Sequence, residues 1–93
     1  MAKAIVTLRI MPESPEIDLE HIRKLAETKI DTFVGEHKLK QHEIKPVAFG
    51  LNSLDIHFMM NEDQGSPDPV AEDIATIEGV QSAEVTNVTR PMG

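Results

Sequence analysis

The sequence predicts an α+β fold in which two helices cover one face of a four-stranded antiparallel sheet. Three observations lead to this prediction. Apolar and polar residues alternate over several short stretches, which is typical of half-buried strands. Two other stretches carry apolar residues three and four positions apart, which is typical of amphipathic helices. Along the 93 residues these stretches follow one another as strand, helix, strand, strand, helix and strand, at a length that suits one compact domain.

The first strand and the first helix have clear patterns. Every second residue of Ala4–Met11 is apolar, so one face of this strand can be buried. Two prolines follow and predict a loop. Asp18 is a suitable N-cap for a helix that runs to about Thr32 and is stopped by Gly35. The residues expected on the buried face of this helix are Leu19, Ile22, Leu25, Ala26, Ile30 and Phe33.

The second and third strands differ in strength. The segment His37–Val47 shows no regular alternation, and Pro46 cannot donate a hydrogen bond to a neighbouring strand. Such a strand belongs at the edge of a sheet. The segment Leu54–Met60 alternates strictly and is expected at the centre, and an acidic turn at residues 61–65 follows it.

The last third of the chain predicts a second helix and a final strand. Ser66 or Asp68 can cap this helix, and Gly79 is expected to end it. Its apolar residues recur at spacings of four and three, namely Val70, Ile74 and Ile77. The final strand covers Val80–Arg90, where Val88 is out of phase and predicts a bulge or fraying. The order of elements is that of the split βαβ, or ferredoxin-like, fold, with the first and third strands at the centre.

Composition limits the possible partners. The chain has 16 acidic against 9 basic residues, a net charge of -7, which opposes binding to the phosphate backbone of nucleic acids. It has no cysteine, which excludes disulfides and thiolate metal sites and suits a reducing cytoplasm. No apolar run approaches the roughly 20 residues of a membrane span, and the start of the chain does not resemble a signal peptide. We therefore expect a cytoplasmic protein with a basic protein partner, no membrane contact and no direct nucleic-acid contact.

The candidate chemical groups do not form a recognisable site. The histidines match no metal-binding spacing; they are His21, His37, His42 and His57. Ser53 and Ser82 have no evident histidine and acid partners in the sequence. The acidic residues after the third strand lack the alternating ligand spacing of a calcium loop. We expect no catalytic residue, no metal site and no cofactor.

Phe49 is the most informative residue. The chain has three phenylalanines and neither tryptophan nor tyrosine. Phe49 lies between Ala48 and Gly50, on the short connection between two strands. Burial of a phenylalanine is worth roughly 1.5 to 3 kcal/mol, so its position on a turn needs a reason. Two interpretations are open: Phe49 folds back over the end of the sheet, or it inserts into another molecule.

Three segments carry a family resemblance. They are Met11–Glu20 (MPESPEIDLE), Lys45–Leu51 (KPVAFGL) and Ile77–Ser82 (IEGVQS). In this order and at these separations they resemble the archaeal translation elongation factor 1-beta family, and the resemblance covers nearly the whole chain. It implies a single guanine-nucleotide exchange domain over residues 1–93, which acts on the GTPase elongation factor 1-alpha and is not an enzyme with covalent chemistry.

The same resemblance implies partner-binding residues. Phe49, flanked by Ala48 and Gly50, corresponds to the loop aromatic that presses into the GTPase. Arg90 corresponds to a basic residue, usually lysine in the eukaryotic relatives, whose tip reaches toward the magnesium and phosphates of the nucleotide site. Arginine is a departure from that pattern, because a planar guanidinium is bulkier than an ammonium. The alternative for Arg90 is a solvated charge near the end of the chain.

Two other functions share the predicted fold. Ferredoxin-like domains also serve as small-ligand regulatory modules, which often have a glycine-rich first loop, whereas this chain has Pro12 and Pro15 there. An acylphosphatase-type enzyme is a weaker alternative, because the segment Gly79–Gln81 is only a fragment of its phosphate-binding loop and the following arginine is missing.

Overall fold

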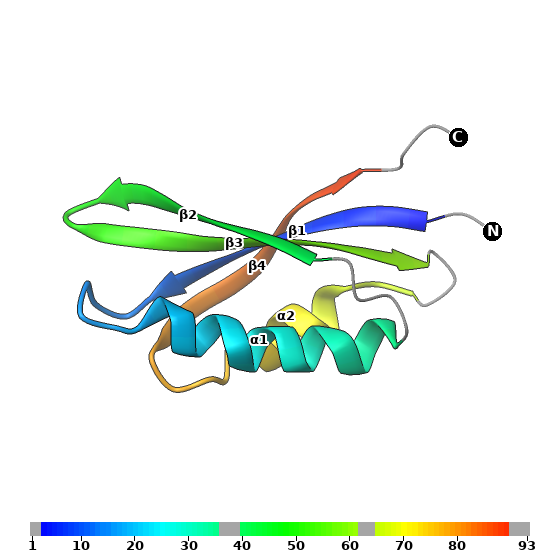
Figure 1. Cartoon of the computed structure of the whole chain (residues 1–93), viewed down its shortest axis with the longest axis horizontal. Coiled ribbons are helices and arrows are strands. Elements are labelled where there is room, and N and C mark those ends of the chain that lie inside the picture. Colours follow the sequence, from blue (N-terminus) through cyan, green and yellow to red (C-terminus); the bar gives the residue numbers. More distant parts are fainter. Residues whose placement is uncertain (1–2, 36–39, 62–64, 90–93) are drawn as a thin grey trace.

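The computed structural model describes residues 3–35, 40–61 and 65–89. The elements follow the predicted order (Figure 1). They are β1 (Lys3–Pro12), α1 (Leu19–Val34), β2 (Lys40–Ala48), β3 (Leu51–Asn61), α2 (Asp68–Ile74) and β4 (Val80–Thr89). The α+β, ferredoxin-like fold class is confirmed.

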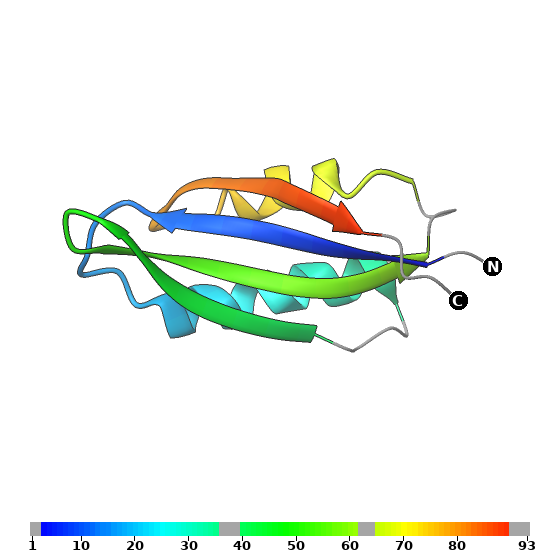
Figure 2. The ribbon, with the colours of Figure 1, turned by 90° about the horizontal axis from the view of Figure 1, so that it is seen from above.

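The four strands form one antiparallel sheet in the order β2-β3-β1-β4. The central positions of the first and third strands are therefore confirmed, as is the edge position of β2, which carries Pro46. Both helices lie on the same face of the sheet, and Figures 1 and 2 show this from two directions. Within the described residues, no helix lies over the other face of the sheet.

The core lies between the sheet and the helices. Alternate residues of β1 and β3 are buried on the helix side, as the period-two patterns predicted. The buried face of α1 recurs every four residues, at Ile22, Ala26, Ile30 and Val34. Leu25 was expected on this face, but it is 40% exposed because the contact with the sheet is narrower than the apolar stripe of the helix. That expectation was wrong.

The ends of α1 follow local chemistry. The carboxylate of Asp18 accepts hydrogen bonds from the backbone N–H groups of Glu20, at 3.0 Å, and His21, at 3.4 Å, so the predicted N-cap is confirmed. Gly35 ends the helix with a φ of 69°, a conformation that glycine adopts without steric cost.

The predicted end of α2 was wrong. The helix stops at Ile74, and the chain reaches β4 through turns in which the N–H of Ile77 donates to the carbonyl of Ile74 at 3.0 Å. The N-cap position is Pro67, with no side-chain cap, although the hydroxyl of Ser66 accepts a hydrogen bond from the N–H of Asp68 at 3.1 Å. Ile77 is buried all the same, so apolar spacing predicted burial correctly and helix length incorrectly.

The predicted irregularity of β4 is a bulge. Thr7 pairs with Asn87 and Leu8 pairs with Val85, which leaves one extra residue on β4 between the two pairs. After this bulge Val88 pairs with Val6, so it returns to the helix side of the sheet. In the described part of the chain, no helix combines the length and the apolar character needed to cross a membrane.

Candidate functional site

The connection between β2 and β3 is a tight turn with an unusual residue in it. Ala48 pairs with Leu51, which leaves Phe49 and Gly50 as the two central residues. Their φ angles are 55° and 75°. Positive φ at both positions is the requirement of a type I′ hairpin turn, which normally takes asparagine, aspartate or glycine first. A bulky residue in this region is strained by about 1 to 2 kcal/mol.

The side chain of Phe49 is open to solvent. It is 96% exposed, and it is the only residue other than glycine with positive φ among residues 3–35, 40–61 and 65–89. The interpretation that Phe49 folds back over the sheet is therefore wrong. Since burial does not compensate for the strain, the fold itself gains nothing from an aromatic residue here.

Two other exposed apolar residues lie on β2, before the turn. Val47 is 51% exposed and lies where the pairing of β2 with β3 shifts register, between Pro46 and Ala48. Ile44, further back on β2, is 48% exposed. Together with Phe49 these two residues give the hairpin an apolar surface, which we call the apolar tip. Grouped exposed apolar side chains typically mark an interaction site.

The three segments of the family resemblance meet at this end of the sheet (Figure 1). A Cβ atom placed on Gly50 would lie 3.9 Å from Cγ of Pro15, so the turn touches the loop between β1 and α1. The N–H of Glu13 in that loop donates to the carbonyl of Gly79 at 2.9 Å. A Cβ atom on Gly79 would lie 3.3 Å from Ile17, a contact that leaves little room for any side chain. Segments far apart in sequence thus lie together at the end of the sheet that carries the Phe49 turn.

A network of charged side chains supports the hairpin from the helix-free face. The carboxylate of Asp55 is only 3% exposed. Arg9 donates to both of its oxygens, from Nε to Oδ1 at 3.3 Å and from Nη2 to Oδ2 at 3.4 Å, and this hydrogen bonding raises the pKa of Arg9. Ser53 donates to Oδ1 at 3.3 Å, and Nζ of Lys45 on β2 lies 3.6 Å from Oδ2. The network connects β1, β3 and β2, so it holds the hairpin arm to the centre of the sheet.

Sequence reasoning missed this network. Asp55 and Arg9 are direct cross-strand partners, and both lie opposite the apolar positions of their strands. Pairing the strands on paper would have placed their opposite charges together, so a signal was present. Burial of the carboxylate was not predictable, because it depends on the side chains that cover it.

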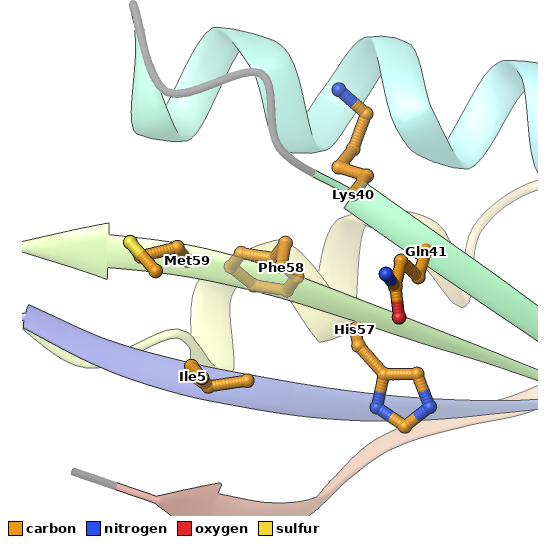
Figure 3. Close-up of a pocket in the computed structure, with 6 residues that line it drawn as sticks. All are labelled: Ile5, Lys40, Gln41, His57, Phe58 and Met59. Carbon is orange, nitrogen blue, oxygen red and sulfur yellow. The ribbon is translucent and has the colours of Figure 1, made fainter. Parts of the chain in front are cut away.

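A small hollow lies on the helix-free face, toward the far end of β3 from Phe49. It encloses about 160 Å³, and Figure 3 shows the residues that line it, among them Ile5 on β1 and His57 and Met59 on β3. Nδ1 of His57 lies 2.9 Å from the hydroxyl oxygen of Thr7, so the ring is held by its neighbour. Ligand pockets usually enclose roughly 300 Å³ or more, so this hollow does not favour a small-ligand site. Within residues 3–35, 40–61 and 65–89, no group of three or more metal-ligating side chains comes together.

The predicted site residues fall into two places. Ala48, Phe49 and Gly50 form the turn, whereas Arg90 lies outside the described residues. Thr89, the last residue of β4, pairs with Ile5, which in turn pairs with Met59 on β3. Met59 is eight residues beyond Leu51 on β3, a separation of about 27 Å at roughly 3.4 Å per residue. The turn and the end of β4 therefore lie at opposite ends of the sheet (Figure 1).

Comparison with known proteins agrees with the arrangement of these segments. Residues 5–90 match the family model described as the EF-1 guanine nucleotide exchange domain. The elongation factor 1-beta of Methanothermobacter thermautotrophicus is 35% identical over 92 residues, which cover 99% of this chain and 100% of that protein. The elongation factor 1-beta of Staphylothermus marinus is 37% identical over 92 residues, covering 97% of this chain and 98% of that protein.

The chain belongs to the EF-1 guanine nucleotide exchange domain family. The match of residues 5–90 includes Phe49 and Arg90. Among relatives, the elongation factor 1-beta of Nanoarchaeum equitans is 36% identical over 83 residues, covering 89% of this chain and 99% of that protein. The resemblance stated from the sequence is confirmed, and with it the assignment to the archaeal-type elongation factors.

Proposed function

We propose that this chain is a guanine-nucleotide exchange factor that promotes release of GDP from elongation factor 1-alpha during translation elongation. Residues 1–93 would act as one exchange domain. The single observation that carries the proposal is Phe49, which is 96% exposed and held at a φ of 55° on the surface where the family segments meet. A strained aromatic that the fold does not need is explained by a partner that receives it.

Phe49 is proposed as an anchor in this complex. Aromatic residues dominate interface energetics when they enter a pocket on the partner, because they bury a large area with few rotatable bonds. Ala48 and Gly50 on either side are small, so the backbone of the partner can come close to the ring. The Asp55 network and the loop at Pro15 fix the direction of the hairpin before binding, which lowers the entropy cost of association.

Arg90 is proposed as the second contact. Bound GDP is held through its phosphates and a magnesium ion that demands near-octahedral coordination. A side-chain cation that displaces magnesium weakens this hold without leaving the phosphate charge uncompensated. Thr89, the residue before Arg90, is level with Met59, which is about 27 Å from the Phe49 turn along β3 at roughly 3.4 Å per residue, so contacts at these two ends of the sheet would touch separate regions of the GTPase.

No covalent step is needed for this function. By thermodynamic linkage, a factor that weakens GDP binding is itself bound less tightly when GDP is present, by the same ratio. Each incoming nucleotide therefore helps to release the factor, which can act again. The proposed setting is the cytoplasm, and the net charge of -7 favours a basic protein surface over nucleic acid as the partner.

Linkage provides the test. The affinity of the chain for purified elongation factor 1-alpha is measured by calorimetry, once with nucleotide-free GTPase and once with the GDP complex in magnesium. We expect binding to the nucleotide-free form to be at least about 100-fold tighter, a coupling of about 2.7 kcal/mol and within the usual range. Equal affinity for the two forms would contradict an exchange function, because no differential binding would be available to expel GDP.

A further inference from the structure

We propose that a groove next to the Phe49 turn is a further contact for the same GTPase, in addition to Phe49 and Arg90, and that it takes an apolar side chain flanked by a lysine or arginine. The inference rests on the proposed function and adds a residue-level description of the partner. The groove encloses about 300 Å³ between the β1–α1 loop and the hairpin. Its apolar walls are Pro12, Pro15, Ile17, Leu19 and Ile44, and we call it the loop groove.

Ile44 shows that the loop groove is an uncovered part of the core face. Ile44 is the direct cross-strand partner of Leu54, so both side chains lie on the helix side of the sheet. Leu54 is fully buried, whereas Ile44 is 48% exposed. Leu54 is on the central strand β3, whereas Ile44 is on the edge strand β2, which has a neighbouring strand on one side only. The fold therefore leaves the apolar side chain of Ile44 half-exposed, although its cross-strand neighbour Leu54 is buried.

The loop groove is continuous with the turn that carries Phe49. Pro15 forms one wall of the groove and lies within van der Waals reach of Gly50, at 3.9 Å from where a Cβ atom would be. Ile44 also lines the groove and belongs to the apolar tip. A partner that covers Phe49 on this side must also cover the rim of the groove, so the two sites form one contact surface.

Charge at the rim indicates the kind of side chain that enters. The carboxylate of Asp18 is used as a helix cap, and that of Glu20 is paired with Arg23. Glu13 and Glu16, on the loop that borders the groove, are exposed and form no ion pair within the described residues. Two carboxylates that pair with no cation among residues 3–35, 40–61 and 65–89 and that lie on the loop beside an apolar groove suit an apolar side chain next to a cation.

The same charges disfavour a second copy of this chain as the occupant. Two copies that met at this end would bring acidic rims together, and each chain carries a net charge of -7. Like charges at an interface are repulsive unless they are paired. A basic region of the GTPase, next to the pocket for Phe49, is the occupant that both the charge and the continuity support.

The first test compares matched substitutions in the full chain. Ile44→Gln makes the groove wall polar, and Leu25→Gln is its control, because Leu25 is 40% exposed on α1 and does not line the groove. Affinity for nucleotide-free elongation factor 1-alpha is measured for both variants. We expect Ile44→Gln to weaken binding about tenfold, or about 1.4 kcal/mol, and Leu25→Gln to change it less than twofold.

A second test reverses a charge at the rim of the groove, so that its result does not depend on how the apolar groove wall packs. Glu16→Lys is compared with Glu72→Lys, an exposed position on α2. We expect Glu16→Lys to weaken binding at low salt by fivefold or more and Glu72→Lys to have a smaller effect. Should Ile44→Gln and Glu16→Lys both bind like their controls while Phe49→Ala binds weakly, the loop groove is not a contact and the exchange function stands. Should the unaltered chain bind no GTPase, both proposals fail.

Cross-linking can identify the facing residue. The chain has no cysteine, so Ser14→Cys introduces a unique thiol that lines the groove. A short thiol-to-amine cross-linker should join Ser14→Cys to a lysine of bound elongation factor 1-alpha, with Glu72→Cys on α2 as the control. Equal cross-linking yields at the two positions would overturn the assignment.

Discussion

Replacement of Phe49 by asparagine should make the protein more stable and less active. Phe49 is 96% exposed, so its removal loses almost no burial. Its φ of 55° is strained for phenylalanine, whereas asparagine is a preferred first residue of a type I′ turn. We expect the free energy of unfolding to rise by about 1 kcal/mol, taken from the low end of the cost of a left-handed residue.

The functional effect should have the opposite sign. An aromatic anchor at an interface typically contributes 2 kcal/mol or more, so the rate of GDP release under subsaturating factor should fall at least about tenfold, or about 1.4 kcal/mol. Denaturant unfolding measures the first effect, and release of fluorescent GDP from elongation factor 1-alpha measures the second. Phe49→Ala is the matched control, because it also removes the ring, but alanine, unlike asparagine, is not a preferred residue at this position of the turn.

The two measurements together can refute the reasoning. If Phe49→Asn lost more than about 1 kcal/mol of stability, the ring would be supporting the fold, as core phenylalanines do when they are truncated. If both Phe49 variants exchanged GDP as fast as the parent, the ring would not contact the GTPase. A gain in stability with a loss of exchange is the outcome that only a strained, partner-binding residue explains.

Further predictions concern charge. Association with the GTPase should slow as salt rises, since an acidic domain of charge -7 is steered toward a basic surface only within a Debye length of about 8 Å at physiological ionic strength, and an unchanged on-rate in stopped flow would contradict this. Arg90→Ala should still bind the GTPase but lose most of the acceleration of GDP release in magnesium, whereas Arg90→Lys should keep this acceleration. A magnesium chelator should remove the difference in GDP release between Arg90→Ala and the parent. If Arg90→Ala releases GDP as fast as the parent in magnesium, the mechanism depends on Phe49 alone. Arg9→Met should lower the free energy of unfolding by about 2 kcal/mol, because Asp55 keeps a buried carboxylate without its main partner, and Asp55→Leu in addition should restore part of the loss. Hydrogen bonds from Arg23 lower the pKa of Glu20. The stabilising contribution of the Glu20 carboxylate is therefore present above the ordinary pKa of about 4.3 and is lost as the pH falls through the lowered value. The difference in unfolding free energy between the parent and Glu20→Gln should shrink in acid, and a difference that is constant with pH would count against this pairing.

The fold could be predicted because its signals are local. Strict alternation in β1 and β3 placed both strands at the centre of the sheet, and Pro46 placed β2 at the edge. The misses occurred where tertiary packing decides. Ile77 is buried although it lies in a turn and not in a helix. Leu25 is exposed because the sheet covers only a narrow face of α1. Spacing alone does not distinguish these cases.

The site was predictable in part. The scarcity of aromatic residues and the flanking proline and glycine indicated that Phe49 is on a turn. The positive φ of Phe49 could not be predicted, because phenylalanine disfavours that conformation and sequence rules assign it to glycine, asparagine or aspartate. The loop groove could not be predicted from the sequence either, because Ile44 and Leu54 are similarly apolar and their different exposure depends on how the strands and the loop pack.

The most direct test of the account is release of fluorescent GDP from elongation factor 1-alpha, with excess unlabelled GDP and less than one equivalent of the chain. A small amount of the chain should release the fluorescent GDP from all of the GTPase molecules, at a rate proportional to the concentration of the chain. The reason is that the incoming nucleotide expels the chain after each exchange, so that it can act again. A release rate equal to the spontaneous rate at every concentration of the chain would contradict the proposed function.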